Sequence, residues 1–205
     1  MTEEDKQKEI LSILGRLWKL WRSLESLISQ ELKYRSEVRE DRDNWDRICS
    51  SSDVINDTLQ AIGSYVKSDY PDEDVGLRYL YVYGLLQALY LQQDAVECLF
   101  KTLRKCYPKN RKFSYKQSTD LKGIRQLRNE TTGHPTETHN GVFTYINRGS
   151  LSKWHFQKLR SSKAGGNEFS SVDLFSMVKK QALSIESDLR TLVEKIKEIE
   201  KMEII

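Results

Sequence analysis

The sequence predicts a mainly α protein: an up-and-down helical bundle of four to five helices with a small β-hairpin insertion. Three observations carry this prediction. Apolar residues recur every three or four positions near both ends of the chain, only three prolines interrupt 205 residues, and strand-forming residues gather in one stretch at about 141–160. A chain of this length, with 31% charged residues, suits one domain over 1–205 with a sizeable core.

The first three helices follow from apolar spacing and from capping residues. The first is expected to run to about Glu40, on a stripe formed by Ile10, Leu14, Leu17, Trp21, Leu24 and Ile28. The second is expected to begin near Ser52 or Asp53, which are good N-cap residues. The third, from about Asp74 to Cys106, is the most apolar, so we expect it at the centre of the bundle.

A short helix and a hairpin are predicted next. Ser118 is suited to cap a helix that runs to about Thr131, because Gly133 and Pro135 then end it. The stretch GVFTYINRGSLSKWHFQ has β-branched and aromatic residues on both sides of NRGS, which is typical of a hairpin. It is followed by RSSKAGGNEFS, which we interpret as a flexible link.

The last helix is expected to open at Ser170, with Asp173 three residues on as in a capping box. Its apolar seam comprises Val178, Ala182, Ile185, Leu189, Leu192, Ile196 and Ile199. Because the first helix has a similar heptad-like seam, we expect the first and last helices to pack as antiparallel partners.

Composition and segment lengths indicate a cytoplasmic protein. Cys98 and Cys106 are eight residues apart, roughly 12 Å along one helix and too far to bridge, and Cys49 makes the number of cysteines odd. Such cysteines are typical of reduced thiols. The N-terminal MTEEDKQKE has no apolar signal core, and the longest apolar run is shorter than a membrane span. We therefore expect no membrane association.

One stretch, RQLRNETTGHP at 125–135, carries unusual chemistry. Arg128 and Asn129 precede a helix break, and His134 follows it. Arginine stays charged and binds phosphate oxygens through two N–H groups, whereas histidine exchanges a proton near neutral pH. An RNA strand supplies its own nucleophile, the 2′-hydroxyl, so this pair suits RNA cleavage without a metal.

The pattern resembles the signature of the HEPN superfamily: an arginine, a polar residue, a few more residues and a histidine. RNETTGH matches it at Arg128, Asn129 and His134, and YVYGLLQALYLQQDAVECL is similar to the family's core helix. The resemblance implies an α-bundle over most of the chain, often dimeric, with two motifs meeting across the interface. For many members it also implies metal-independent ribonuclease activity in defence or toxin systems. We therefore expect an endoribonuclease with Arg128, His134 and Asn129 as catalytic residues, and a possible antitoxin or defence-system partner protein.

A basic run beside the motif suggests how RNA is bound. Ten Lys or Arg lie between Lys101 and Arg128 against one acid, Asp120, which fits a polyanionic partner or a solvated positive face. Within this run, Lys122 and Arg125 are candidates for RNA contact.

Three further residues are candidates for the RNA site. Asp94 is a lone acid in the apolar third helix, where it could hold Arg128 or His134 in place or simply mark the wet side of the helix. Trp154 and His155 have basic neighbours, so bases could stack there, or the two residues could pack the hairpin on the bundle.

Other functions and partners follow from the same residues. A catalytically silent HEPN-like bundle would bind nucleotide, RNA or a partner protein. A plain helical scaffold would use the motif as a helix C-cap, with Arg128 paired to Glu130 or Asp120. Heptad-like seams and the aromatic RYLYVYG exceed what a small bundle must bury, which predicts a homodimer. His134 and His139 have no Cys or acid at ligand spacing, and no phosphate-binding loop is present, so we expect neither metal nor cofactor.

Overall fold

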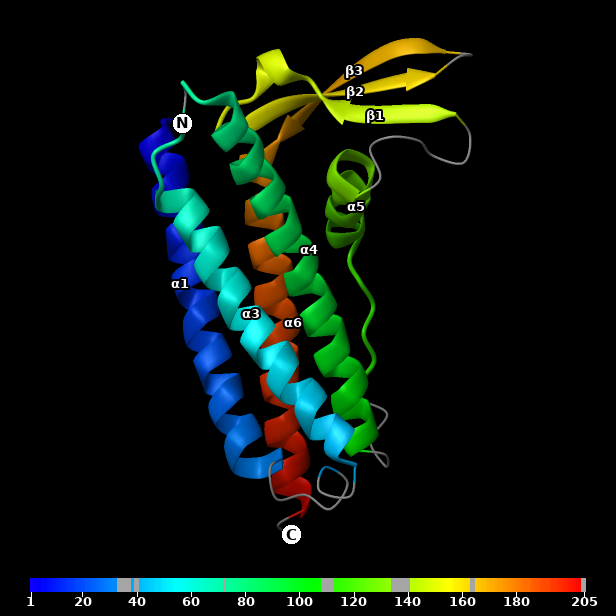
Figure 1. Ribbon diagram of the computed structural model, residues 1–205. Coiled ribbons are helices and arrows are strands. Elements are labelled where there is room, and N and C mark those ends of the chain that lie inside the picture. The colour runs from blue at the N-terminus through cyan, green and yellow to red at the C-terminus, as the bar shows by residue number, and fades with distance from the viewer. Residues whose placement is uncertain are drawn as a thin grey trace.

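The computed structural model describes residues 1–32, 38, 41–71, 73–107, 113–133, 141–162 and 165–203. Five α-helices and one three-stranded antiparallel sheet account for most of these residues, which confirms the predicted mainly α bundle with a small β insertion (Figure 1). The helices are α1 (Glu3–Leu27), α3 (Arg42–Lys67), α4 (Val75–Cys106), α5 (Thr119–Arg128) and α6 (Leu174–Glu203). Within the described ranges, no helix has an apolar stretch that could cross a membrane.

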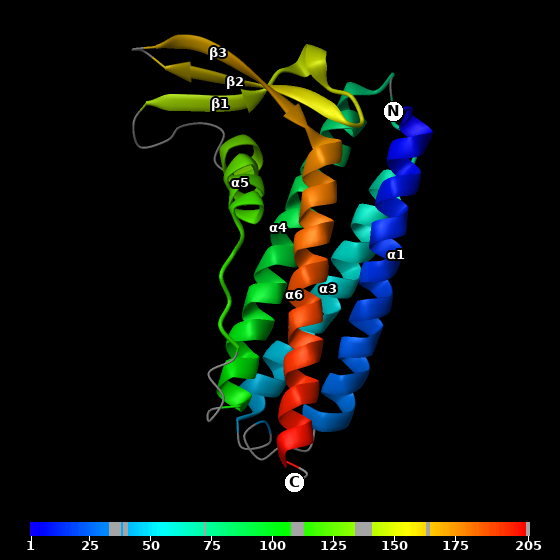
Figure 2. The ribbon, with the colours of Figure 1, turned by 180° about the vertical axis from the view of Figure 1, so that it is seen from behind.

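Four long helices, α1, α3, α4 and α6, lie side by side, and the short α5 packs on α4 below the sheet (Figures 1 and 2). The prediction that α1 and α6 are antiparallel is wrong. Glu9 pairs with Lys179 and Arg16 pairs with Glu186, so residue numbers rise together along both helices. The physical reason is that the chain runs back along α4 through residues 113–118 and α5 before α6 begins. Helix α6 therefore starts at the same end of the bundle as α1 and runs in the same direction.

Helix α3 begins at Arg42 and not near Ser52 or Asp53, as expected. Asp41 caps it by accepting the backbone N–H of Asp43. The early turns of α3 bury small polar side chains in place of aliphatic ones, at Asn44, Ser51 and Ser52, with Ile48 between them. The spacing of apolar residues therefore did not predict the first ten residues of α3. At the other boundary, α1 passes into a π-helical turn, η1 (Ile28–Leu32), and the expected end near Glu40 lies outside the described residues.

The sheet has one strand more than predicted. Its strands are β1 (Val142–Ile146), β2 (His155–Ser162) and β3 (Gly166–Asp173), in the order β1-β2-β3. The hairpin of β1 and β2 is present, with a short 3-10 turn, η3 (Arg148–Ser150), between them. The expected flexible link, 160–170, contains the end of β2 and the first five residues of β3, whose polar and mostly exposed side chains show no apolar alternation.

The expected start of the last helix is also wrong. Ser170 pairs with Lys158 inside the sheet, and α6 begins at Leu174. Asp173 accepts the backbone N–H of Ser176 at 3.1 Å and so satisfies a free donor at the start of α6.

A network of buried glutamines joins α4, α6 and the segment that returns along α4. Gln181 of α6 accepts a hydrogen bond from Gln93 at 2.7 Å, and its own amide N–H donates to the Leu89 carbonyl at 2.9 Å and to Gln92 at 3.1 Å. Gln117 of the returning segment donates to Gln93 at 2.8 Å. Because Gln92, Gln93 and Gln181 are fully buried, these bonds fix how α4 and α6 are aligned.

A buried lysine fastens the sheet end of the molecule to α1 and α3. The ammonium of Lys153 donates to the Ser68 carbonyl at 2.6 Å and lies 3.2 Å from the Glu3 carboxylate. The Lys153 carbonyl accepts the Tyr65 hydroxyl, and burial raises the pKa of that hydroxyl. The segment between β1 and β2 is thereby attached to the ends of two helices.

The glutamine network generates a stability prediction. Gln181→Leu would leave the Gln93 side-chain amide N–H and the Gln92 side-chain oxygen without these partners in the core, so we expect a loss of about 2–4 kcal/mol in the free energy of unfolding. Urea denaturation followed by circular dichroism measures this loss. The exposed Gln60→Leu is the matched control and should change stability by less than about 0.5 kcal/mol. Equal midpoints for the two variants would contradict the role given to the network.

Candidate functional site

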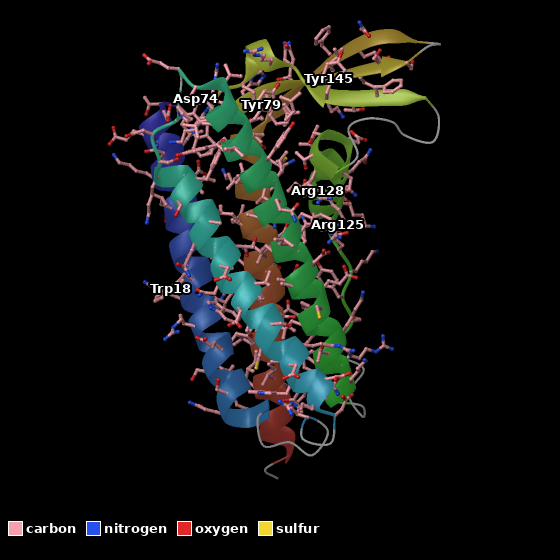
Figure 3. All side chains as sticks on the ribbon, in the orientation of Figure 1. Trp18, Asp74, Tyr79, Arg125, Arg128 and Tyr145 are labelled. Atoms are coloured by element: carbon pink, nitrogen blue, oxygen red, sulfur yellow. The ribbon has the colours of Figure 1, made fainter. Side chains whose placement is uncertain are left out.

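Helix α5 places the motif arginine against the central helix. Ser118 caps α5 by accepting the backbone N–H of Leu121, as predicted, and the buried Leu121 and Ile124 hold one face of α5 on the bundle. Arg128 is the last residue of α5, and Figure 3 shows it and Arg125 between α5 and α4. The packing of α5 on α4 thus decides where both guanidinium groups lie.

The Arg128 guanidinium is held on two sides. Its Nε and Nη2 both donate to the Gln87 side-chain oxygen of α4, at 3.1 and 2.8 Å. Its Nη1 donates to the side-chain oxygen of Asn129 at 3.0 Å. Three of the five guanidinium N–H groups are therefore engaged, and the other two make no hydrogen bond to a described residue.

A tyrosine of α4 lies under both arginines. The Arg128 and Arg125 guanidinium carbons lie 4.4 and 4.6 Å from the centre of the Tyr90 ring, close enough for cation–π attraction. Arg125 also has its Nη2 2.6 Å from a carboxylate oxygen of Asp94. Gln87, Tyr90 and Asp94 are three and four residues apart, so they form one face of α4 that meets α5.

This group, which we call the arginine cluster (Arg125, Arg128, Gln87, Tyr90 and Asp94), carries two cations against one carboxylate. The Nε and Nη2 of Arg125 are buried and make no hydrogen bond to a described residue, so the contact of Nη2 with Asp94 is an ion pair without hydrogen-bond geometry. Both guanidinium groups keep donors that no described residue uses, so the cluster is suited to bind an anion such as a phosphate group.

The residues after Arg128 form a π-helical turn, η2 (Asn129–Gly133), which joins α5 to the sheet. Glu130 accepts hydrogen bonds from Lys158 of β2 and from Gln126, both at 2.7 Å. Burial raises the pKa of Glu130, but these hydrogen bonds outweigh burial and hold the pKa below its ordinary value. The motif is therefore connected to the sheet through an ionised pair.

The helix C-cap interpretation expected Arg128 to pair with Glu130 or Asp120, and neither pair is present. Glu130 pairs with Lys158, and Asp120 pairs with Lys180 at 3.1 Å, so neither acid holds Arg128. Asp94 was expected to hold Arg128 or His134, but it pairs with Arg125 and not with Arg128. The other predicted partner, His134, lies outside the described residues, as does His139.

The structure brings together only some of the predicted RNA-contact residues. Arg125 and Asp94 belong to the arginine cluster, and Lys122 is exposed on α5. Trp154 is buried and packs edge-on against Tyr65 and Phe175, so the packing alternative describes it and its ring has no free face for a base. His155 is half-buried at the start of β2, where its Nε2 lies 2.7 Å from the Ser171 hydroxyl.

Sequence reasoning did not identify Gln87 and Tyr90 as site residues. The signal was a spacing of three and four residues from Gln87 to Tyr90 to Asp94 within the apolar third helix. This spacing could not be assigned to a partner until the path of the chain after α4 was known.

Among the described residues, no group of three or more His, Cys, Asp or Glu side chains could hold a metal ion. Comparison of the chain with protein-family models, with curated proteins and with solved structures gave no match. The functional argument therefore rests on the residues of the site.

The pair formed by Glu130 and Lys158 generates a pH prediction. Because the pKa of Glu130 is lowered in the folded protein, the pair stabilises the fold above the ordinary glutamate pKa, and this contribution is lost as pH falls through the lowered pKa. A double-mutant cycle with Glu130→Gln and Lys158→Met should give a coupling energy of about 1 kcal/mol at pH 7, and this energy should decrease as the pH falls through the lowered pKa of Glu130. A coupling energy that does not change with pH would contradict an ionised pair.

Proposed function

We propose that this protein is a HEPN-like, metal-independent endoribonuclease of a defence or toxin–antitoxin system. The observation that supports the proposal is the setting of Arg128. Its guanidinium is oriented by Gln87, Asn129 and Tyr90, while two of its N–H groups make no hydrogen bond to a described residue. An arginine held in this way can donate two hydrogen bonds to one phosphate without further rearrangement.

The proposed reaction uses the RNA as its own nucleophile. His134 takes the proton of the 2′-hydroxyl, the 2′-oxygen forms a bond to phosphorus, and the bond from phosphorus to the 5′-oxygen breaks. The leaving 5′-oxygen receives a proton from water or from the second motif of a dimer, and the products are a 2′,3′-cyclic phosphate and a 5′-hydroxyl. Arg128 stabilises the added negative charge on the phosphorane, and Asn129 orients Arg128. Arg125 and Lys122 bind neighbouring phosphates.

One observation favours a second candidate, a silent bundle that binds RNA, nucleotide or a partner protein without cleavage. Three N–H groups of Arg128 donate hydrogen bonds inside the protein, and Arg125 forms an ion pair with Asp94. Such engagement suits stable binding of a phosphate group as well as catalysis. The two candidates differ in whether bound RNA is cut.

The catalytic proposal predicts cleavage of RNA in the presence of a chelator, with a 2′,3′-cyclic phosphate product and no cleavage of DNA. His134→Ala should reduce the rate by about 10²–10⁴-fold, because the proton-transfer group is lost. Arg128→Lys should fail as well, because an ammonium cannot form the two parallel hydrogen bonds of a guanidinium. Gel analysis of a labelled RNA measures both effects, and Arg104→Lys, at an exposed position of α4, is the matched control.

The same variants separate the two candidates. Overproduction of the wild type should slow growth, and overproduction of either motif variant should not. If the purified wild type binds RNA, never cuts it and binds it equally well with both substitutions, the catalytic proposal is overturned and the silent-bundle alternative holds.

A homodimer is part of the proposal, and an exposed stripe on α4 supports it. Leu77, Leu80, Gly84 and Leu91 are spaced as in a heptad seam, all are exposed, and Leu80 is 65% exposed. Leu80 and Gly84 also line a groove of about 270 Å³. Gln87, which holds Arg128, lies on the same stripe. A second copy packed there would bury the stripe and bring two arginine clusters together.

Substitution on this stripe tests the dimer. Leu80→Glu should place a charge in the interface and convert the dimer to a monomer at micromolar concentration, as measured by light scattering after gel filtration. The matched control is Leu183→Glu, at an exposed leucine of α6, which should leave the mass unchanged. A wild type that is monomeric at the same concentration would contradict the dimer.

A further inference from the structure

The outer face of the sheet carries a row of aromatic side chains. In an antiparallel sheet, residues paired directly across strands place their side chains on the same face. Tyr145 of β1 pairs with Leu159 of β2, which pairs with Phe169 of β3. Phe143 lies two residues before Tyr145 and so belongs to the same face. We call these three aromatic residues, with Leu159 between them, the aromatic row.

The aromatic row faces away from the bundle. The alternate residues of β1, Thr144 and Ile146, are buried beneath the sheet. Tyr145 is 46% exposed and Phe169 is 59% exposed, whereas Leu159 between them is 7% exposed. Cross-strand neighbours therefore cover the leucine and leave aromatic rings on the surface. Exposed rings of this size are not needed for the core, so a ligand that stacks on them is expected.

We propose that the aromatic row is a platform on which the bases of single-stranded RNA stack. The inference rests on the proposed function for the identity of the polymer, and it adds the surface that holds the strand outside the cleavage site. Stacking suits any base because every base has a π-face. Double-stranded RNA does not offer its bases for stacking, so the platform selects unpaired segments.

The surroundings of the row favour a nucleic acid over a protein partner. The same face carries amide, hydroxyl and imidazole groups that can bind base edges: His155, Gln157, Ser161, Asn167 and Ser171. The side chains of Lys158 and Arg160 lie on the opposite face of β2, and the one acid among the described residues of this face, Asp173, caps α6. Exposed Arg148, in the turn that follows β1, can contact the phosphates of a strand on the platform.

The platform is connected to the arginine cluster by a short path. β1 is an edge strand of the sheet, and it contacts the η2 turn that follows Arg128. Figure 3 shows Tyr145 at the sheet, with Arg128 and Arg125 on the α5 side below it. An RNA strand that leaves Phe143 and Tyr145 therefore passes one strand edge before it reaches Asn129 and Arg128.

Equilibrium binding tests the platform. The probe is a fluorescent 12-nucleotide RNA of mixed sequence with 2′-O-methyl groups, which cannot be cleaved through its 2′-hydroxyl, and anisotropy gives its dissociation constant. Tyr145→Ala and Phe169→Ala should each weaken binding by about tenfold, and the double variant by more. Tyr145→Phe keeps the ring and should bind as the wild type does. Trp18→Ala, which removes an exposed ring on α1, is the matched control.

Photocrosslinking tests the same surface in the unaltered protein, so the result does not depend on the folding of a variant. RNA that contains 4-thiouridine should crosslink to peptides from 141–146 and 166–173. Wild-type affinity in the double variant, or crosslinks confined to other segments, would overturn the platform. Loss of self-association with unchanged RNA affinity would also overturn it and would assign the row to contacts between copies.

Failure of the platform and failure of the nuclease are distinguishable. If the double variant binds the probe as tightly as the wild type while unmodified RNA is still cut, only the platform is overturned. If the double variant loses affinity but the wild type cuts no RNA, the platform holds and the nuclease proposal is overturned.

Discussion

The position of the candidate site depends on the need of buried amide groups for hydrogen-bond partners. Gln93 and Gln181 have no access to water, so they must bond to each other and to neighbouring groups. Their alignment brings Gln117 to α4, and the residues before it are held by the stack of Phe113 on Tyr107 and the contact of Tyr115 with Phe100. The chain after α4 is thereby guided back along α4 to the start of α5. Without this return, Arg125 and Arg128 would have no fixed position.

Electrostatics then explains why two arginines are tolerated side by side. Arg125 and Arg128 are three residues apart on α5, where like charges repel. The Tyr90 ring lies under both guanidinium groups, Asp94 neutralises one, and the Gln87 oxygen accepts two hydrogen bonds from the other. One carboxylate for two cations leaves a positive excess that a phosphate group would complete. The contacts that stabilise the helix end are therefore the same contacts that would orient the two guanidinium groups toward an anion.

Sequence patterns predicted elements whose signals are local, and they missed those that depend on tertiary contacts. The apolar run of α4 and the Ser118 cap of α5 could be predicted directly, because burial requires a run of apolar residues and capping requires one characteristic residue. The start of α3 was hidden because Asn44 and Ser51 occupy core positions, and β3 was hidden because its residues are mostly exposed. The direction of α6 and the roles of Gln87 and Tyr90 follow from how the chain returns after α4, which no local pattern records. In the site, Arg128, Asn129 and Arg125 were found from residue type, since guanidinium groups near a helix end are chemically distinctive.

In the proposed function the sheet connects two RNA contacts, the platform and the arginine cluster. Lys153 attaches the sheet to the ends of α1 and α3, while the pair of Lys158 with Glu130 attaches it to the η2 turn, so the sheet is fixed to the bundle at two points. Tyr145 and Phe169 lie two strands apart, about 10 Å at the usual spacing of about 4.8 Å. In this proposal a strand leaves the platform at the β1 edge, where the sheet contacts η2, and it approaches Arg128 from there. Unpaired RNA would then be held by the platform as well as by the arginine cluster.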